Sequence, residues 1–197
     1  MNSVAIVTGA SQGIGRSTAI RLARDFSAIA VAARDGSALK EVADTVKTVG
    51  AEPLVLDLDL SKVESAEALV KTTLDRFGRI DALLNIAGAV PQIDLFEMTE
   101  EQWRAGMELK LHGARRVTIL AWEALKKSKG SVVFMSGSAA LDPKPAFAAV
   151  AATKQFPEEA RISRYGRPEE IADLLAFMVS PAARWMTVAP SEWTEVK

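Results

Sequence analysis

The stretch Val4–Gly15 constrains the fold most strongly, because a strand, a glycine-rich turn and a helix follow one another within it. Val4 to Val7 is an apolar run of strand length, and the turn contains Gly9, Gly13 and Gly15. One face of the following helix would carry Ile14, Thr18, Leu22 and Phe26. This order of elements presents backbone N–H groups and a helix N-terminus to a phosphate. Glycines in turns are also common for structural reasons alone, but the position of these three favours an anion-binding turn.

The composition describes an ordinary globular protein. The 197 residues are 49% hydrophobic and 25% charged, which is typical of one domain spanning residues 1–197. A net charge of −1 gives no electrostatic reason to expect a nucleic-acid or membrane partner. No apolar run reaches the length of a membrane span, and the first strand begins too early to leave room for a signal peptide. The absence of cysteine agrees with a reducing compartment, so we expect a cytoplasmic protein. No cluster of His, Asp or Glu has the spacing of a metal site.

Strands and helices alternate along the rest of the chain. Further strands are expected at residues 28–33, 54–58, 80–85 and 131–135, with helices at 37–49, 61–77, 99–127 and 168–179. Capping boxes at Ser61–Glu64 and Thr99–Gln102 predict where two of the helices begin. The alternation predicts an α/β fold, a doubly wound parallel sheet in three αβα layers. Right-handed crossovers then place the ligand at the carboxyl ends of the first and fourth strands.

Short segments of the chain resemble the short-chain dehydrogenase/reductase family. Four of them fall within residues 1–154 and the fifth lies beyond: Thr8–Gly15, Asp59–Ser61, Asn85–Gly88, Gly130–Ser138 and Arg167–Ala172. The resemblance implies a Rossmann-like fold that binds NAD or NADP. It also implies that Asp59 contacts the adenine amine and that Asn85 to Gly88 form the wall beside the adenine ribose. Ile86 stands where the family usually has a second asparagine. The implied cofactor-binding residues are Gly9, Ser11, Gln12, Gly13, Ile14, Gly15, Arg34, Asp59, Leu60, Asn85, Ala87 and Gly88.

The end of the second strand decides between the two cofactors. An NAD site usually offers a carboxylate to the ribose 2′-hydroxyl about 20 residues beyond the glycines. Here the expected acidic position is Ala33, followed by Arg34, whose guanidinium suits a 2′-phosphate. Asp35 is the alternative carboxylate, although it is better placed as a cap for the next helix. The residues therefore favour NADP over NAD.

The resemblance also implies an activity and the residues that perform it. The family is composed of oxidoreductases that transfer hydride between the nicotinamide and a carbonyl or alcohol, here a small-molecule substrate. A tyrosine transfers the proton, a lysine four residues later lowers its pKa, and a serine and an asparagine complete the site. Ser138 and Lys154 match the serine and the lysine. Val150 stands at the tyrosine position and cannot transfer a proton, while Lys110 stands at the asparagine position.

No other residue clearly supplies the missing proton. Tyr165, the only tyrosine, lies at the entry to a late helix, and His112, the only histidine, does not share a helix face with Lys110. Lys110 could orient the substrate or donate a proton if burial lowered its pKa, or its ammonium could reach solvent. The catalytic residues predicted by the resemblance are therefore Ser138, Lys154 and Lys110.

The chain departs from the family after Lys154. The remainder of a long helix, a sixth strand and the loop that covers the nicotinamide are all missing from the sequence. The family would supply much of the substrate pocket and of its oligomer interface from this segment. We expect a homo-dimer or homo-tetramer by family resemblance. Two alternatives remain open, a non-catalytic NAD(P)-binding protein and an incomplete, inactive chain.

Overall fold

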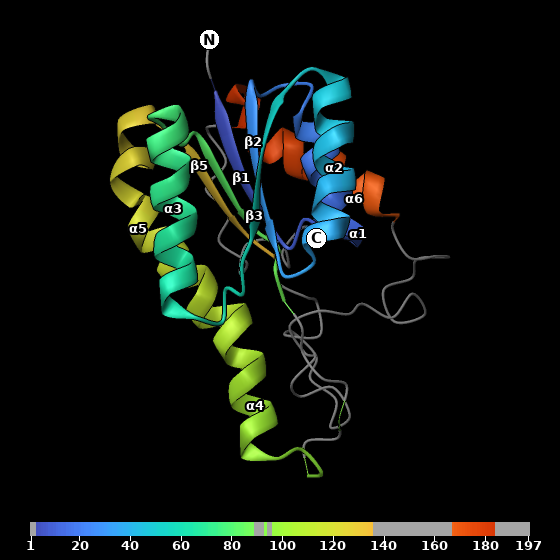
Figure 1. The fold of residues 1–197 in the computed structure, drawn as a ribbon, viewed down its shortest axis with the longest axis vertical. Helices are drawn as coiled ribbons and strands as arrows, with labels where there is room; N and C mark the ends of the chain where they lie inside the picture. The colour runs from blue at the N-terminus through green and yellow to red at the C-terminus, as the bar shows by residue number, and fades with distance from the viewer. Residues whose placement is uncertain (1–2, 89–92, 94–95, 136–166, 184–197) are drawn as a thin grey trace, which may run out of the picture.

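The computed structural model describes residues 3–88, 93, 96–135 and 167–183 of the chain, and these form helices on both sides of a sheet (Figure 1). The elements in chain order are β1 (Val4–Thr8), α1 (Gly13–Leu22), β2 (Ala28–Ala33), α2 (Gly36–Val49), β3 (Glu52–Asp57), α3 (Val63–Phe77), β4 (Ala82–Asn85), α4 (Glu100–Met107), a π-helical segment η1 (Glu108–Gly113), α5 (Ala114–Ser128), β5 (Ser131–Phe134), α6 (Pro168–Met178) and a 3-10 turn η4 (Pro181–Ala183).

All pairings between the described strands are parallel, and the sheet order is β3-β2-β1-β4-β5. Ile6 at the centre of β1 lies opposite Ala30 of β2 on one side and Leu83 of β4 on the other. The chain moves outward from β1 to β3 and then returns to place β4 on the other side of β1. This reversal creates a crevice at the carboxyl ends of β1 and β4. The predicted doubly wound, three-layer fold is confirmed.

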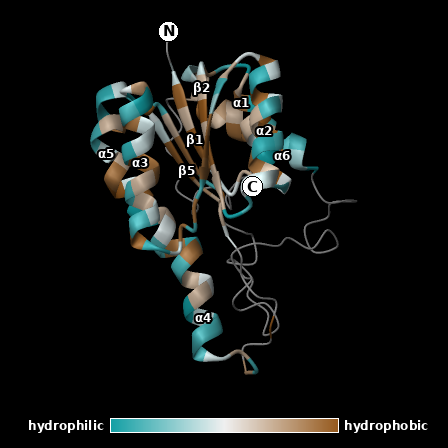
Figure 2. Ribbon diagram, viewed as in Figure 1, coloured by the Kyte–Doolittle hydropathy of each residue, from teal (hydrophilic) through white to brown (hydrophobic). Residues whose placement is uncertain are grey.

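Two hydrophobic clusters cover the two faces of the sheet. Helices α1, α2 and α6 pack on one face and α3 and α5 on the other, while α4 extends away from the sheet (Figure 1). All five residues of β1 are buried, since helices cover this central strand on both sides. Figure 2 shows mainly hydrophobic residues along the strands, whereas the helices carry both hydrophilic and hydrophobic residues. A strand that is buried on both faces is apolar along most of its length, so the apolar run Val4 to Val7 correctly predicted β1.

One of the two predicted capping boxes is confirmed and the other is wrong. At α4, the Thr99 hydroxyl accepts from the Gln102 amide, and the Gln102 side chain accepts from the Thr99 amide. Ser61 does not cap α3, which begins after Lys62 without a side-chain cap. The Ser61 hydroxyl instead donates to the Asp59 carboxylate at 2.8 Å. The hydroxyl is therefore oriented toward a charged acceptor just after β3 and does not accept from a helix amide as the capping box required.

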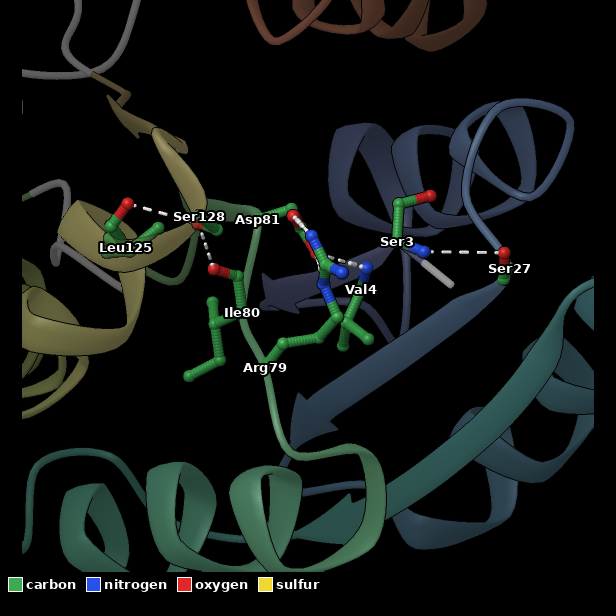
Figure 3. Close-up of polar contacts among 8 residues, drawn as sticks. All are labelled: Ser3, Val4, Ser27, Arg79, Ile80, Asp81, Leu125 and Ser128. Carbon is green, nitrogen blue, oxygen red and sulfur yellow. Dashed lines mark hydrogen bonds and ion pairs between the residues drawn. The ribbon is translucent and has the colours of Figure 1, made fainter. Parts of the chain in front are cut away.

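Asp81 holds the amino-terminal edge of the sheet together, opposite the crevice (Figure 3). Its carboxylate accepts from the Val4 amide at 2.8 Å and from two guanidinium nitrogens of Arg79 at 2.8 and 2.6 Å. Nearby, the Ser128 hydroxyl at the end of α5 donates to the Ile80 carbonyl at 2.7 Å. These bonds fix where β1 and β4 begin and leave their carboxyl ends to form the site.

Candidate functional site

The glycine turn after β1 packs tightly against the chain that follows β4. Gly9 has φ +69°, and a Cβ at this position would lie 2.9 Å from the Cα of Ala87. A Cβ on Gly15 would lie 2.1 Å from the Gly9 carbonyl oxygen. Only glycine permits both the left-handed backbone and these approaches. The turn is therefore held against Ala87 with its main chain facing the crevice.

Thr8, for which the sequence predicted no role, joins the two sides of the crevice. Its buried hydroxyl donates to the Leu84 carbonyl at 3.2 Å and accepts from the amides of Ile86 and Ala87 at 3.0 and 3.1 Å. One side chain at the end of β1 thus fixes the path of the chain beyond β4. No local pattern could have predicted these bonds, because the partners are 76 to 79 residues away along the chain.

A cleft of about 490 Å³ opens at the carboxyl ends of β1, β2, β3 and β4. This volume is within the range of small-molecule and cofactor sites. Ten of the twelve predicted cofactor-binding residues line it: Gly9, Ser11, Gln12, Gly13, Ile14, Gly15, Arg34, Leu60, Ala87 and Gly88. Asp59 and Asn85 are not among the lining residues. Six further residues line it: Ile86, which lies within the predicted wall Asn85 to Gly88, Asp35, which was the alternative carboxylate, and Ala32, Ala33, Leu58 and Leu109.

Asp59 is held in place just outside the cleft. One of its carboxylate oxygens accepts from the Ser61 amide at 3.1 Å and the Ser61 hydroxyl at 2.8 Å. Partial burial alone would raise the pKa of the Asp59 carboxyl, but the bonds from Ser61 and the positive charges of Arg34 and Lys62 lower it overall. Asp59 therefore presents an oriented anion beside the leucine that lines the cleft, Leu60.

Arg34 and Asp35 have different roles at the end of β2. The Asp35 carboxylate accepts from the Ala38 amide at 3.0 Å and caps α2, as the sequence predicted. Arg34 is exposed, lines the cleft and contributes its charge to the Asp59 site. The guanidinium is thus accessible to an anionic ligand, whereas the carboxylate next to it is engaged in a helix cap.

Asn85 faces α5 rather than the cleft. Its side-chain amide donates to the Thr118 hydroxyl at 3.1 Å, and that hydroxyl donates in turn to the Ala114 carbonyl at 2.8 Å. The other side-chain atom, Oδ1, is buried and has no partner among the described residues. The visible role of Asn85 is therefore to attach α5 to the end of β4.

Lys110 lies in η1, where the helix between α4 and α5 widens from α- to π-helical hydrogen bonding. Its side chain lies against Gly88, because a Cβ on that glycine would be 2.8 Å from Lys110 Cδ and 3.3 Å from Nζ. Burial lowers the pKa of the Lys110 amine. The sequence left open whether the Lys110 amine lies in the site or reaches solvent. In the structure it lies against Gly88, which lines the cleft.

The cleft has the properties that a dinucleotide phosphate requires. Helix α1 begins at its glycine turn, has no acidic residue in its first turn, and has no side-chain cap at Gln12. Its first amides are therefore not satisfied by a capping side chain, and the helix dipole favours an anion there. Gly9 and Gly15, where a Cβ would clash with neighbouring backbone atoms, keep the turn in this conformation beside the cleft. The residues present thus fit NAD or NADP.

The remaining predictions concern other candidate residues, metal binding and membrane-spanning helices. Ser138, Val150, Lys154 and Tyr165 lie outside the described residues, whereas His112 lies within them and is exposed. Within the described ranges, no three His, Cys, Asp or Glu side chains are grouped so as to hold a metal ion. None of the helices in that part of the chain is both long and apolar enough to span a membrane.

The sequence matches known proteins over most of its length. A family model for short chain dehydrogenase matches residues 3–159. The chain is 34% identical over 166 residues to 11-beta-hydroxysteroid dehydrogenase A of Sesamum indicum, covering 81% of this chain and 47% of that protein. It is 35% identical over 202 residues to the granaticin polyketide synthase putative ketoacyl reductase 2 of Streptomyces violaceoruber, covering 98% of this chain and 75% of that protein. The chain thus spans about half the length of the sesame relative.

The fold also matches solved structures. A metagenomic short-chain oxidoreductase in complex with NADP superposes with a TM-score of 0.80 at 28% identity. The match covers 90% of this chain and 90% of the other. The similarity therefore extends over the sheet and the helices that form the cleft.

Proposed function

Since the chain belongs to the short-chain dehydrogenase family, we propose that it is an NADP-dependent oxidoreductase acting on a small carbonyl or alcohol substrate. The observation that carries the proposal is the cleft, which brings the glycine turn, Arg34 and the chain after β4 together around one volume. The metagenomic short-chain oxidoreductase that matches this fold was crystallised with NADP. We propose that the present chain binds the same ligand, NADP.

In this proposal each part of the cleft recognises one part of the coenzyme. Backbone amides between Gly9 and Gly15 and the N-terminus of α1 bind the pyrophosphate. Arg34 binds the 2′-phosphate, which a planar guanidinium contacts through two parallel hydrogen bonds. Asp59 accepts from the adenine amine, and Ala87 and Gly88 form the wall beside the ribose. Asn85 supports that wall through its bond to Thr118 on α5.

The chemistry would be shared between the coenzyme and three side chains. When bound, NADPH supplies the hydride. Ser138 would hold the substrate oxygen, and Lys154 would bring positive charge to the site by family resemblance. Lys110 would supply or orient a proton, because its amine lies against a cleft residue and burial lowers its pKa. Loss of a general acid typically lowers a rate by about 10²–10⁴, so Val150 at the tyrosine position predicts slow turnover.

A non-catalytic NAD(P)-binding protein is the second candidate, and Val150 is the observation that favours it. The two are separated by mixing the protein and NADPH with a panel of carbonyl compounds and following loss of NADPH absorbance. Turnover that disappears in Lys110→Met and persists in Lys127→Met supports the enzyme. NADPH binding without turnover on any substrate supports the binder, and no binding supports an incomplete, inactive chain.

The coenzyme preference is tested by fluorescence titration with NADPH and NADH. Charged hydrogen bonds contribute about 1.5–3 kcal/mol, so Arg34→Ala should weaken NADPH binding about 10- to 100-fold and leave NADH binding unchanged. Arg24→Ala is the matched control, because this exposed arginine is not among the residues that line the cleft. Equal losses in the two variants would remove Arg34 from the proposed site.

We further propose that the protein is a cytoplasmic homo-oligomer, a dimer or tetramer. Ile119, Leu120 and Trp122 of α5 are 55%, 42% and 49% exposed. Large apolar side chains gathered on one helix are typical of a surface that another protein covers. A second copy of this chain is the proposed partner.

A further inference from the structure

Arg116, near the start of α5, connects two parts of the molecule that are separate in sequence. One guanidinium nitrogen donates to the Ser61 carbonyl at 3.3 Å, and another pairs with the Glu108 carboxylate. The Arg116 and Glu108 side chains are 25% and 37% exposed, so the pair is better shielded from water than most surface pairs. Arg116 therefore ties η1 and α5 to the loop that follows β3.

The same loop contacts η1 a second time, through its main chain. A Cβ on Gly113 would lie 2.5 Å from the Leu60 carbonyl oxygen, so only glycine allows the loop to approach the helix this closely. Leu60 lines the cleft, and Asp59 and Ser61 on either side of it are bonded to each other. The adenine side of the proposed site thus rests directly on η1.

Lys110 is the residue whose place depends on these contacts. It lies in η1 between Glu108, which Arg116 holds, and Gly113, which supports Leu60. From there its side chain reaches Gly88, which lines the cleft. A π-helical segment is rare within an α-helix and frequently occurs at functional sites. Contacts from outside η1, such as those of Arg116, would help to hold η1 in this form.

We infer that Arg116 is a positioning residue, which holds η1 against the Leu60–Ser61 loop and thereby keeps the Lys110 amine against Gly88. The inference rests on the proposed function only in that Lys110 and the Leu60–Ser61 loop belong to the same proposed active site. Arginine is required because its planar fork reaches two acceptors at once. A lysine at position 116 keeps the charge but offers a single compact ammonium, which cannot bridge both acceptors in the same geometry.

The test measures how readily the Lys110 amine reacts with acetic anhydride across a pH series, using the whole chain and mass spectrometry of the Lys110 peptide. If η1 is released, the amine reaches water and its labelling midpoint moves to higher pH, toward that of exposed lysines in the same protein. Arg116→Lys should produce this shift without a change of net charge. Arg115→Lys, at the exposed neighbouring position, should not. An unchanged midpoint in Arg116→Lys, or equal shifts in both variants, overturns the inference.

A second variant changes Glu108, the other partner of the ion pair with Arg116. Glu108→Gln removes an anion two residues from Lys110, and that loss by itself would lower the labelling midpoint. A rise in Glu108→Gln therefore reports release of η1, whereas a fall or no change contradicts the inference. This variant decides the question if Arg116→Lys does not fold.

A parallel titration separates this inference from the proposed function. Coupling through a packed network typically changes affinity by 0.5–2 kcal/mol, so Arg116→Lys should weaken NADPH binding about 2- to 30-fold. If NADPH does not bind even the unmodified chain, the proposed function fails while the labelling result still decides the role of Arg116. If NADPH binds the unmodified chain but the Lys110 labelling midpoint is unchanged in Arg116→Lys, the positioning role of Arg116 is refuted and the proposed function stands.

Discussion

Replacing Gly9 with alanine tests whether the glycine turn is held against Ala87. Gly9 has φ +69°, a conformation that raises the energy of an L-residue by about 1–2 kcal/mol. The new Cβ would also lie 2.9 Å from the Ala87 Cα, and such overpacking adds about 1–3 kcal/mol because backbone atoms must shift. We therefore expect Gly9→Ala to lower the free energy of unfolding by about 2–5 kcal/mol, measured by urea denaturation.

Gly78→Ala provides a matched control for the backbone term. Gly78 has φ +71°, nearly the value of Gly9, and a Cβ there would meet no atom within 4 Å. This variant should lose only about 1–2 kcal/mol and should bind NADPH normally. Gly9→Ala should also lose NADPH affinity, because the displaced turn and Ala87 both line the cleft. Equal losses of stability, with NADPH binding intact in both, would refute the reasoning.

Three further predictions concern single side chains. Ser61→Ala should raise the Asp59 pKa toward its ordinary value of 3.8 and lower stability at pH 7 by about 1 kcal/mol. That difference should disappear as pH falls through the lowered pKa of folded Asp59, and a pH-independent difference would contradict the assignment. Lys110→Met should raise the melting temperature at pH 7, because the unfolded state binds the Lys110 proton more tightly up to about pH 10.5; a lower melting temperature at pH 7 would argue against burial of the amine. Trp122→Glu should convert an oligomer into a monomer in light scattering, while Lys127→Glu should not; an unchanged mass in Trp122→Glu would exclude α5 as the interface.

Much of the fold was predictable because its signals are local. The apolar run of β1 follows from burial on both faces, and the Thr99 cap and the Asp35 cap depend on residues within three positions. The glycine turn was also readable, since its spacing places it between a strand and a helix. These features need no knowledge of distant contacts, so their residues were assigned correctly.

The remaining features depend on contacts that a local pattern does not contain. The Ser61 hydroxyl donates to the carboxylate of Asp59 two residues away, whereas the capping box assumes that its oxygen accepts from a helix amide. The π-helical segment has no compositional signature, so the helix from α4 to α5 was expected to be continuous. The contacts of Thr8, Arg116 and Gly113 join segments that only the folded chain brings together.

The central claim is that the cleft recognises the phosphorylated adenosine half of NADP. Calorimetric titration with 2′,5′-ADP and with 5′-AMP tests it without the nicotinamide. One charged contact from Arg34 predicts that 2′,5′-ADP binds about 10- to 100-fold more tightly than 5′-AMP. Equal affinities, or no binding of either nucleotide, would contradict the account.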